Sequence, residues 1–171
     1  MRVIVCSELV KSYRDRKVLN HVSFSIEENT ITGLVGRNGA GKTTLLKILA
    51  GLLKKSQGDI HVFKEYPFNS LNVSANTVYI DNQMPFPATL TLSDILQQGQ
   101  HFYENWDMNF ARRLFDYFSF EPNEFYENLS KGKKSTFQII FGLATRCNSH
   151  YWMNLQLEWI RLQEMTSTES Y

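Results

Sequence analysis

The sequence predicts an α/β fold, a core with a mainly parallel sheet followed by an α-helical subdomain. Short apolar runs with strand-like spacing surround one helical pattern in the first half of the chain. A glycine-rich motif stands between one of these runs and that helical pattern. After Pro85 and Pro87 the patterns become helical, as expected for a helical region beside a sheet.

The individual elements follow from hydrophobic periodicity. We expect strands at residues 3–10, 22–26, 30–35, 58–63 and 77–80. We expect helices at residues 42–52, 91–98, 107–118 and 136–145. The sequence contains no repeat, no low-complexity tract and no linker-like stretch.

Composition limits the classes of function. The chain has 171 residues and a net charge of +1, so nothing in its charge points to nucleic acid as a partner. Cys6 and Cys147 lack metal-type spacing, and two isolated thiols fit a reducing cytoplasm. The longest apolar run, residues 139–144, is far too short to span a bilayer. We therefore expect any role at a membrane to come through a partner chain.

Residues 36–43, Gly-Arg-Asn-Gly-Ala-Gly-Lys-Thr, match the phosphate-loop pattern G-x-x-x-x-G-K-[ST]. Glycines let several backbone N–H groups converge on one phosphate chain, and the following helix adds its positive end. Lys42 can reach the β- and γ-phosphates, and the Thr43 hydroxyl can ligate Mg²⁺. The alternative is a glycine-rich turn before a core helix. The motif together with its context predicts a P-loop NTPase core that binds ATP and Mg²⁺.

Further segments resemble the ATP-binding subunits of ABC transporters. The loop with its continuation into Thr44 and Leu45 is similar to that family's version. Upstream, the run Val10-Lys11-Ser12-Tyr13 places an aromatic where the family stacks one on adenine, which implies this role for Tyr13. The alternative is an ordinary tyrosine at a strand end. The resemblance implies nucleotide contacts from Tyr13 and from Gly36, Asn38, Gly39, Ala40, Gly41, Lys42, Thr43 and Thr44.

Gln83 follows the expected strand at 77–80 and precedes the helical region. It resembles the family's glutamine loop, which implies contact with Mg²⁺ or the attacking water and a place near the docked transmembrane partner. The alternative is a surface glutamine. By the same resemblance Lys42 and Gln83 are the catalytic candidates, and Thr43 and Gln83 the metal ligands.

The run Leu129-Ser130-Lys131-Gly132-Lys133 resembles the ABC signature in an LSKG form, departing from LSGGQ at both lysines. Ser130 and the Gly132 backbone stand at the start of a predicted helix and offer donors to an anion. The cluster Lys131, Lys133 and Lys134 is unfavourable beside a helix N-terminus, and a γ-phosphate from a second subunit would relieve it. The alternative is a capped surface helix with solvated lysines.

The resemblance runs from about Val3 to about Arg146 and stops where the family continues into an apolar strand ending in Asp-Glu. Residues 148–171 as written contain neither that strand end nor a histidine switch. We therefore expect a fold that is incomplete at the C-terminal end. The predicted organisation is a nucleotide-binding core at 1–85, a helical subdomain with the signature at 86–146, and an aberrant tail at 147–171.

The tail is consistent with a shift of reading frame. Trp and Met each have one codon, so a frame beginning at the third base reads Trp152–Met153 as Asp and Met153–Asn154 as Glu. The same frame forces Asp from Trp159–Ile160, and it forces leucines before the first Asp. Loss of one base near residues 146–148 would explain this match. The alternative is a C-terminal amphipathic helix with Trp152, Leu155, Trp159 and Leu162 at helical spacing.

The resemblance implies an ATP-binding subunit at the inner, cytoplasmic face of the membrane. Its partners would be a transmembrane permease subunit and a second ATP-binding subunit paired head to tail. One alternative is a soluble ABC-type ATPase acting on ribosomes or DNA, which the near-neutral charge disfavours. The other is a nucleotide-binding module without hydrolysis, because the catalytic Asp-Glu pair is absent as written.

Overall fold

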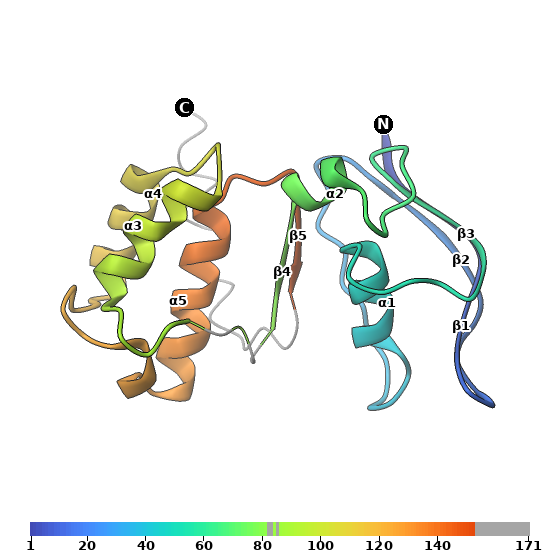
Figure 1. The fold of residues 1–171 in the computed structure, drawn as a ribbon, viewed down its shortest axis with the longest axis horizontal. Coiled ribbons are helices and arrows are strands. Elements are labelled where there is room, and N and C mark those ends of the chain that lie inside the picture. Colours follow the sequence, from blue (N-terminus) through green and yellow to red (C-terminus); the bar gives the residue numbers. More distant parts are fainter. Residues whose placement is uncertain (82–83, 85, 153–171) are drawn as a thin grey trace. The chain divides into compact units, whose positions relative to one another are not determined.

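The computed structural model of the chain describes residues 1–81, 84 and 86–152. It divides into two compact units, Met1–Tyr79 and a second that begins at Ile80 (Figure 1). The strands are β1 (Arg2–Tyr13), β2 (Arg16–Glu27), β3 (Gln57–Val62), β4 (Thr77–Ile80) and β5 (Ser149–Trp152). The helices are α1 (Lys42–Leu49), α2 (Leu71–Ala75), α3 (Leu92–Phe102), α4 (Met108–Tyr117), the 3-10 helix η1 (Tyr126–Asn128) and α5 (Lys131–Ala144).

A three-stranded antiparallel sheet in the order β2-β1-β3 forms most of the first unit. The two residues Arg14 and Asp15 connect β1 to β2, and Arg14 has a φ of 51°. Such a short turn returns the chain directly, so consecutive strands must run antiparallel. The sheet therefore differs from the mainly parallel arrangement that we predicted for the core.

Helix α1 begins at Lys42, as predicted, but it ends at Leu49 and not at residue 52. The backbone N–H of Leu52 donates to the Lys47 carbonyl at 2.9 Å, and the N–H of Gly51 donates to Ile48 at 3.1 Å. This pair of bonds is the Schellman motif, and the φ of 75° at Gly51 favours glycine at this helix end. The buried face of α1 consists of Leu45, Ile48 and Leu49.

Residues 30–35, which we predicted as a strand, form none in the structure. Ile31 and Val35 are 69% and 95% exposed. No described strand pairs with this run. An apolar run becomes a strand only where a neighbouring backbone completes its hydrogen-bond ladder, and periodicity alone says nothing about that neighbour. The prediction of a strand here was wrong for this reason.

The second unit has a core of aliphatic and aromatic side chains contributed mainly by α3, α4 and α5. Phe137 of α5 is fully buried, and Phe86 makes edge-to-face contacts with the rings of Tyr126, Phe137 and Phe141 at centroid distances of 4.8 to 5.6 Å. Helices α3 and α4 agree with the predicted ones to within a few residues, whereas α5 begins five residues before the predicted start at 136. Within the described ranges no helix has the length and apolar character needed to cross a membrane.

Strands β4 and β5 form a second sheet of two strands. Strand β4 has the bounds that we predicted. We predicted no strand after residue 145, whereas Ser149–Trp152 form β5, in which Tyr151 is buried. Trp152 therefore lies in a strand and does not begin the alternative C-terminal helix. Both hypotheses for the tail, the shifted reading frame and the amphipathic helix, depend mainly on residues 153–171. These residues lie outside the described residues.

Candidate phosphate-binding site

The predicted phosphate loop leads directly into α1. The backbone N–H of Ala40 donates to the Arg37 carbonyl at 3.1 Å and closes a turn. Gly39 and Gly41 have φ angles of 81° and 91°, a region that L-residues with a side chain rarely adopt. At Gly41 a Cβ would also lie 2.8 Å from the Val18 carbonyl oxygen and 2.8 Å from Cδ2 of Leu19. The glycine at position 41 is therefore required both by conformation and by the close approach of β2.

The N-terminus of α1 is open to a ligand. Gly41 is the N-cap and supplies no side-chain hydrogen bond, and the first turn contains no acidic residue. The first backbone N–H groups of a helix have no intrahelical acceptor and carry the positive end of the helix dipole. Thr43 and the loop residues 36–40 are exposed, and Thr44 is half-buried in the same turn. The geometry therefore suits an anionic group bound by backbone donors, with two threonine hydroxyls nearby.

The Lys42 side chain folds back over the loop that precedes it. Its ammonium donates hydrogen bonds to the carbonyl oxygens of Gly36 at 2.5 Å and Arg37 at 3.0 Å. Both acceptors belong to the loop, so the positive charge lies beside the uncapped helix end. An ammonium in this place adds a mobile point charge to the fixed backbone donors.

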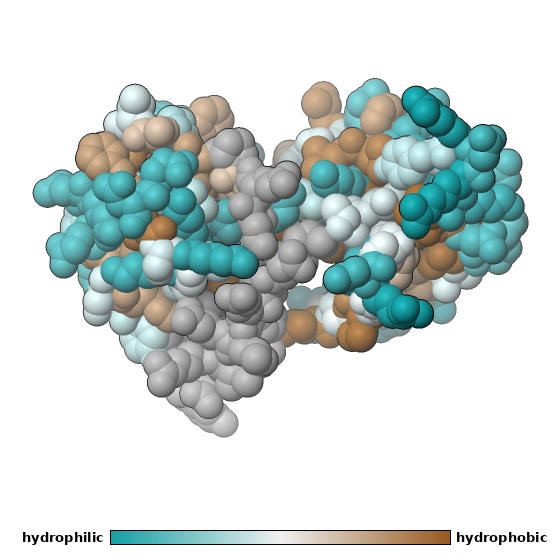
Figure 2. Space-filling model, turned by 90° about the horizontal axis from the view of Figure 1, so that it is seen from below, coloured by the Kyte–Doolittle hydropathy of each residue, from teal (hydrophilic) through white to brown (hydrophobic). Residues whose placement is uncertain are grey.

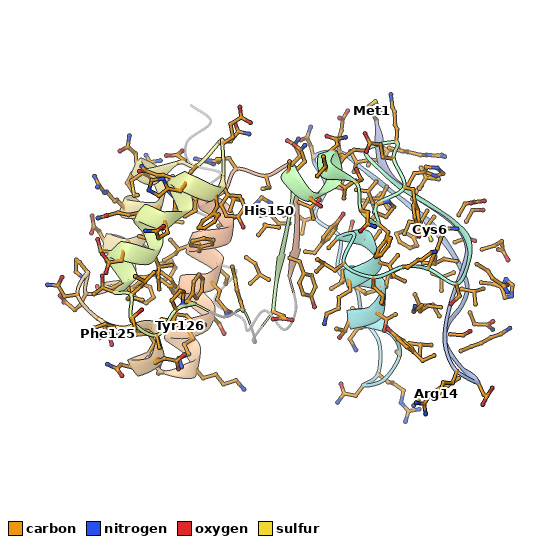
Figure 3. All side chains as sticks on the ribbon, viewed as in Figure 1. Met1, Cys6, Arg14, Phe125, Tyr126 and His150 are labelled. Carbon is orange, nitrogen blue, oxygen red and sulfur yellow. The ribbon has the colours of Figure 1, made fainter. Side chains whose placement is uncertain are left out.

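Tyr13 stands at the end of β1, just before the turn to β2. The register pairs Lys11 of β1 with Leu19 of β2, and Leu19 is one of the residues that Gly41 closely approaches. Two residues of strand, about 7 Å, separate Lys11 from Tyr13. The hairpin turn, marked by Arg14 in Figure 3, and the start of α1 in Figure 1 both lie at the lower end of the first unit. Tyr13 is 47% exposed, so it remains accessible to solvent at this end of the hairpin.

Ser130 and Gly132 lie at the start of α5 in the second unit. The Ser130 hydroxyl accepts a hydrogen bond from the Lys133 backbone N–H at 3.3 Å, as expected of an N-cap. A Cβ at Gly132 would meet no atom within 4 Å, so its backbone is freely approached. Seen from below, the surface of the second unit is largely hydrophilic (Figure 2). This helix start is also a site at which backbone donors face solvent.

The lysines near this helix start have local partners that the sequence did not reveal. The Lys134 ammonium donates to Glu127 at 3.2 Å and lies 5.3 Å from the centroid of the Tyr126 ring. The Lys133 ammonium lies 5.6 Å from the Phe120 ring centroid. These contacts offset part of the unfavourable helix-dipole interaction that we expected. The cluster is therefore compatible with α5 without any bound anion.

Gln83, the predicted glutamine-loop residue, lies outside the described residues. In the part of the chain that the structure describes, no group of three or more His, Cys, Asp and Glu side chains is arranged to hold a metal ion. The exposed Thr43 hydroxyl in the first turn of α1 is available to ligate a divalent cation together with oxygens of a bound phosphate group. Phosphate-bound Mg²⁺ is commonly held in this way.

Known proteins that are similar in sequence indicate the family to which this chain belongs. The family described as "ABC transporter" matches residues 19–149. The chain is 29% identical over 148 residues to the ABC transporter ATP-binding protein YtrB of Bacillus subtilis, covering 84% of this chain and 49% of that protein. It is 31% identical over 165 residues to the cytochrome c biogenesis ATP-binding export protein CcmA of Reclinomonas americana, covering 90% and 73%.

A third relative, the SkfA peptide export ATP-binding protein SkfE of Bacillus subtilis, is 30% identical over 139 residues, covering 78% of this chain and 58% of that protein. The chain thus spans only about half the length of YtrB and SkfE.

Solved structures agree on the fold. One described as the ATP-binding subunit of an ABC transporter superimposes with a TM-score of 0.81 at 22% identity, covering 98% of this chain and 75% of that one. A dimeric ATP-binding cassette bound to ADP and Pi gives a TM-score of 0.72 at 17% identity, covering 87% and 72%. At these identities the likeness concerns the fold, and it confirms the predicted α/β class with a P-loop NTPase core.

Proposed function

Because the chain belongs to the ABC transporter ATP-binding family, we propose that it binds ATP and Mg²⁺ at residues 36–43 as the ATP-binding subunit of a transporter. The observation that carries this proposal is the phosphate loop itself. Gly39 and Gly41 adopt left-handed conformations at the uncapped start of α1, and the Lys42 ammonium donates to the carbonyls of Gly36 and Arg37 in the same loop. Backbone donors, a helix dipole and a mobile cation together are the elements of a polyphosphate site.

The proposed roles follow the geometry of the loop and the family resemblance. Lys42 binds the β- and γ-phosphates, and the Thr43 hydroxyl ligates Mg²⁺. Tyr13 stacks on the adenine. Gln83 is assigned to Mg²⁺ and the attacking water by resemblance alone. Backbone and polar groups that surround the phosphates come from Gly36, Asn38, Gly39, Ala40, Gly41 and Thr44.

The proposed assembly contains two further chains. One is a second ATP-binding subunit in a head-to-tail dimer, whose nucleotide Ser130 and Gly132 would contact. The other is a transmembrane permease subunit at the inner face of the membrane. The relatives CcmA and SkfE are described as export proteins, which supports a transport role without indicating the substrate.

We further propose that residues 1–85 act as the nucleotide-binding core and residues 86–146 as the helical subdomain with the signature. Residues 147–171 are proposed to be a shifted reading of the segment that carries the catalytic Asp and Glu in the family. Both assignments rest on the sequence patterns described above.

Substitution of Lys42 by alanine tests the proposed site. We expect Lys42→Ala to abolish measurable ATP binding in titration calorimetry while the chain stays folded by circular dichroism. The matched control is Lys54→Ala, which removes an exposed lysine shortly after α1 and should leave the affinity within about 2-fold of wild type. An unchanged affinity in Lys42→Ala would defeat the assignment.

A further inference from the structure

Lys11 makes a contact that the phosphate loop does not explain. It lies two residues before Tyr13 on β1, at a point where the pairing of β1 with β2 is irregular. Its ammonium is 4.9 Å from the centroid of the Tyr13 ring. It also donates a hydrogen bond to the Lys54 carbonyl at 2.8 Å. The cation is therefore held between a backbone acceptor and the aromatic ring.

The Lys54 carbonyl is itself fixed in place. The segment that follows α1 bonds to β1 at two points, through the Ser56 N–H to the Val10 carbonyl at 2.9 Å and the Ser12 N–H to the Ser56 hydroxyl at 3.0 Å. The two β1 residues that make these bonds, Val10 and Ser12, are the immediate neighbours of Lys11 in the sequence. The ammonium consequently has a preferred position, although lysine side chains are usually free to rotate.

A cation at this distance from an aromatic ring attracts the ring and restrains its rotation. Tyr13 remains 47% exposed, so the restrained ring still has accessible surface for a second partner. Its strand pairs with the part of β2 that Gly41 approaches, so the ring belongs to the neighbourhood of the phosphate loop.

We propose that Lys11 is a positioning residue for nucleotide recognition: it holds the Tyr13 ring so that the open surface of the ring receives the base. This inference rests on the proposed ATP site. A ring that is already held in place loses less entropy when a base stacks on it. Lys11 should therefore raise the affinity for ligands that contain a base, and it should leave the affinity for a phosphate chain without a base unchanged.

The test compares MgATP with Mg-tripolyphosphate, which lacks the base, by titration calorimetry on the full chain. We expect Lys11→Met, which keeps the aliphatic stem, to weaken ATP binding about 2- to 10-fold and to leave tripolyphosphate binding unchanged. Tyr13→Ala should lose base-dependent affinity in the same way. Lys11→Arg should restore wild-type behaviour, because a guanidinium keeps both the donor and the cation–π contact.

Lys17→Met is the matched control. Lys17 lies on β2 opposite Ser12, so this variant removes the same charge from the same hairpin without touching the ring contact. Equal weakening of ATP and tripolyphosphate in Lys11→Met would overturn the inference, since it would indicate general electrostatic attraction or damage to the fold. Unchanged ATP affinity in Lys11→Met would overturn it as well. If the wild-type chain bound neither MgATP nor Mg-tripolyphosphate, the proposed function itself would be wrong, and this inference, which rests on it, would be wrong as well.

Discussion

Gly41 shows how a single residue without a side chain shapes the site. It combines a φ of 91° with a close approach to the Val18 carbonyl and the Leu19 side chain. We expect Gly41→Ala to destabilise the first unit by about 1–3 kcal/mol, because the left-handed conformation and the contact both penalise a Cβ. Urea denaturation measures this, with Gly33→Ala as the control, since a Cβ at Gly33 meets nothing within 4 Å. Equal stability losses in the two variants would refute the role of conformation.

The two cysteines should differ in reactivity. Cys6 is buried in β1, and burial raises the pKa of its thiol to about 11. Little thiolate forms at neutral pH, and the thiolate is the reactive species. Cys147 is only partly buried. We expect a thiol reagent at pH 8 to label Cys147 in the folded chain and Cys6 only after unfolding, as followed by mass spectrometry. Fast labelling of Cys6 in a folded Cys147→Ser variant would contradict the burial of the Cys6 thiol.

At the scale of elements, Asp107 joins two helices of the second unit. Its carboxylate accepts from the Phe110 N–H at 2.9 Å as the N-cap of α4, and it pairs with the Arg146 guanidinium at 2.7 Å. Its backbone N–H donates to the Ala144 carbonyl at the end of α5. The Phe110 hydrogen bond first, and the Arg146 contact second, hold the pKa of Asp107 below its ordinary value.

The stabilisation from a lowered carboxyl pKa is present above the ordinary pKa and is lost as the pH falls through the folded-state pKa. We expect Asp107→Ala to cost about 0.5–2 kcal/mol near pH 7 and progressively less in acid. Thermal unfolding as a function of pH measures the difference. The control Asp116→Ala removes an exposed acid near the other end of α4, where a negative charge opposes the helix dipole, and should be neutral or slightly stabilising. A pH-independent cost for Asp107→Ala would contradict the argument.

At the scale of the whole molecule, the family resemblance implies that hydrolysis needs an acidic pair after the strand that follows the signature helix. The residues after β5 are Met153 and Asn154, where the family resemblance implies Asp and Glu. Phosphoryl transfer relies on positioning and electrostatics, so we expect residues 1–171 to release phosphate from ATP no faster than background. A phosphate-release assay with Lys42→Ala as the blank measures this. Robust turnover that Lys42→Ala removes would refute the prediction.

The same residues permit a test of the shifted reading frame. We expect resequencing of the gene across the codons for residues 146–148 to reveal a missing base. Restoration of that base would place Asp and Glu after the strand. A confirmed printed frame, with a stop codon soon after the second Asp in the shifted frame, would exclude the hypothesis.

The sequence by itself determined the phosphate loop and the helix that follows it. These features depend on neighbours within a few residues, so composition and spacing specify them directly. Helices α3 and α4 were predictable for the same reason, because their buried faces recur at helical spacing. The early start of α5 was not, since its first turn is polar and carries no apolar periodicity.

Only the tertiary structure decided which segments pair. It made the β2-β1-β3 sheet antiparallel, left residues 30–35 without a strand partner, and brought the Lys54 carbonyl to Lys11 across 43 positions of sequence. Each of these outcomes depends on hydrogen bonds between residues far apart in the chain. Periodicity reports which side of an element is apolar, but it carries no information about the neighbour that completes a backbone ladder or receives a charge.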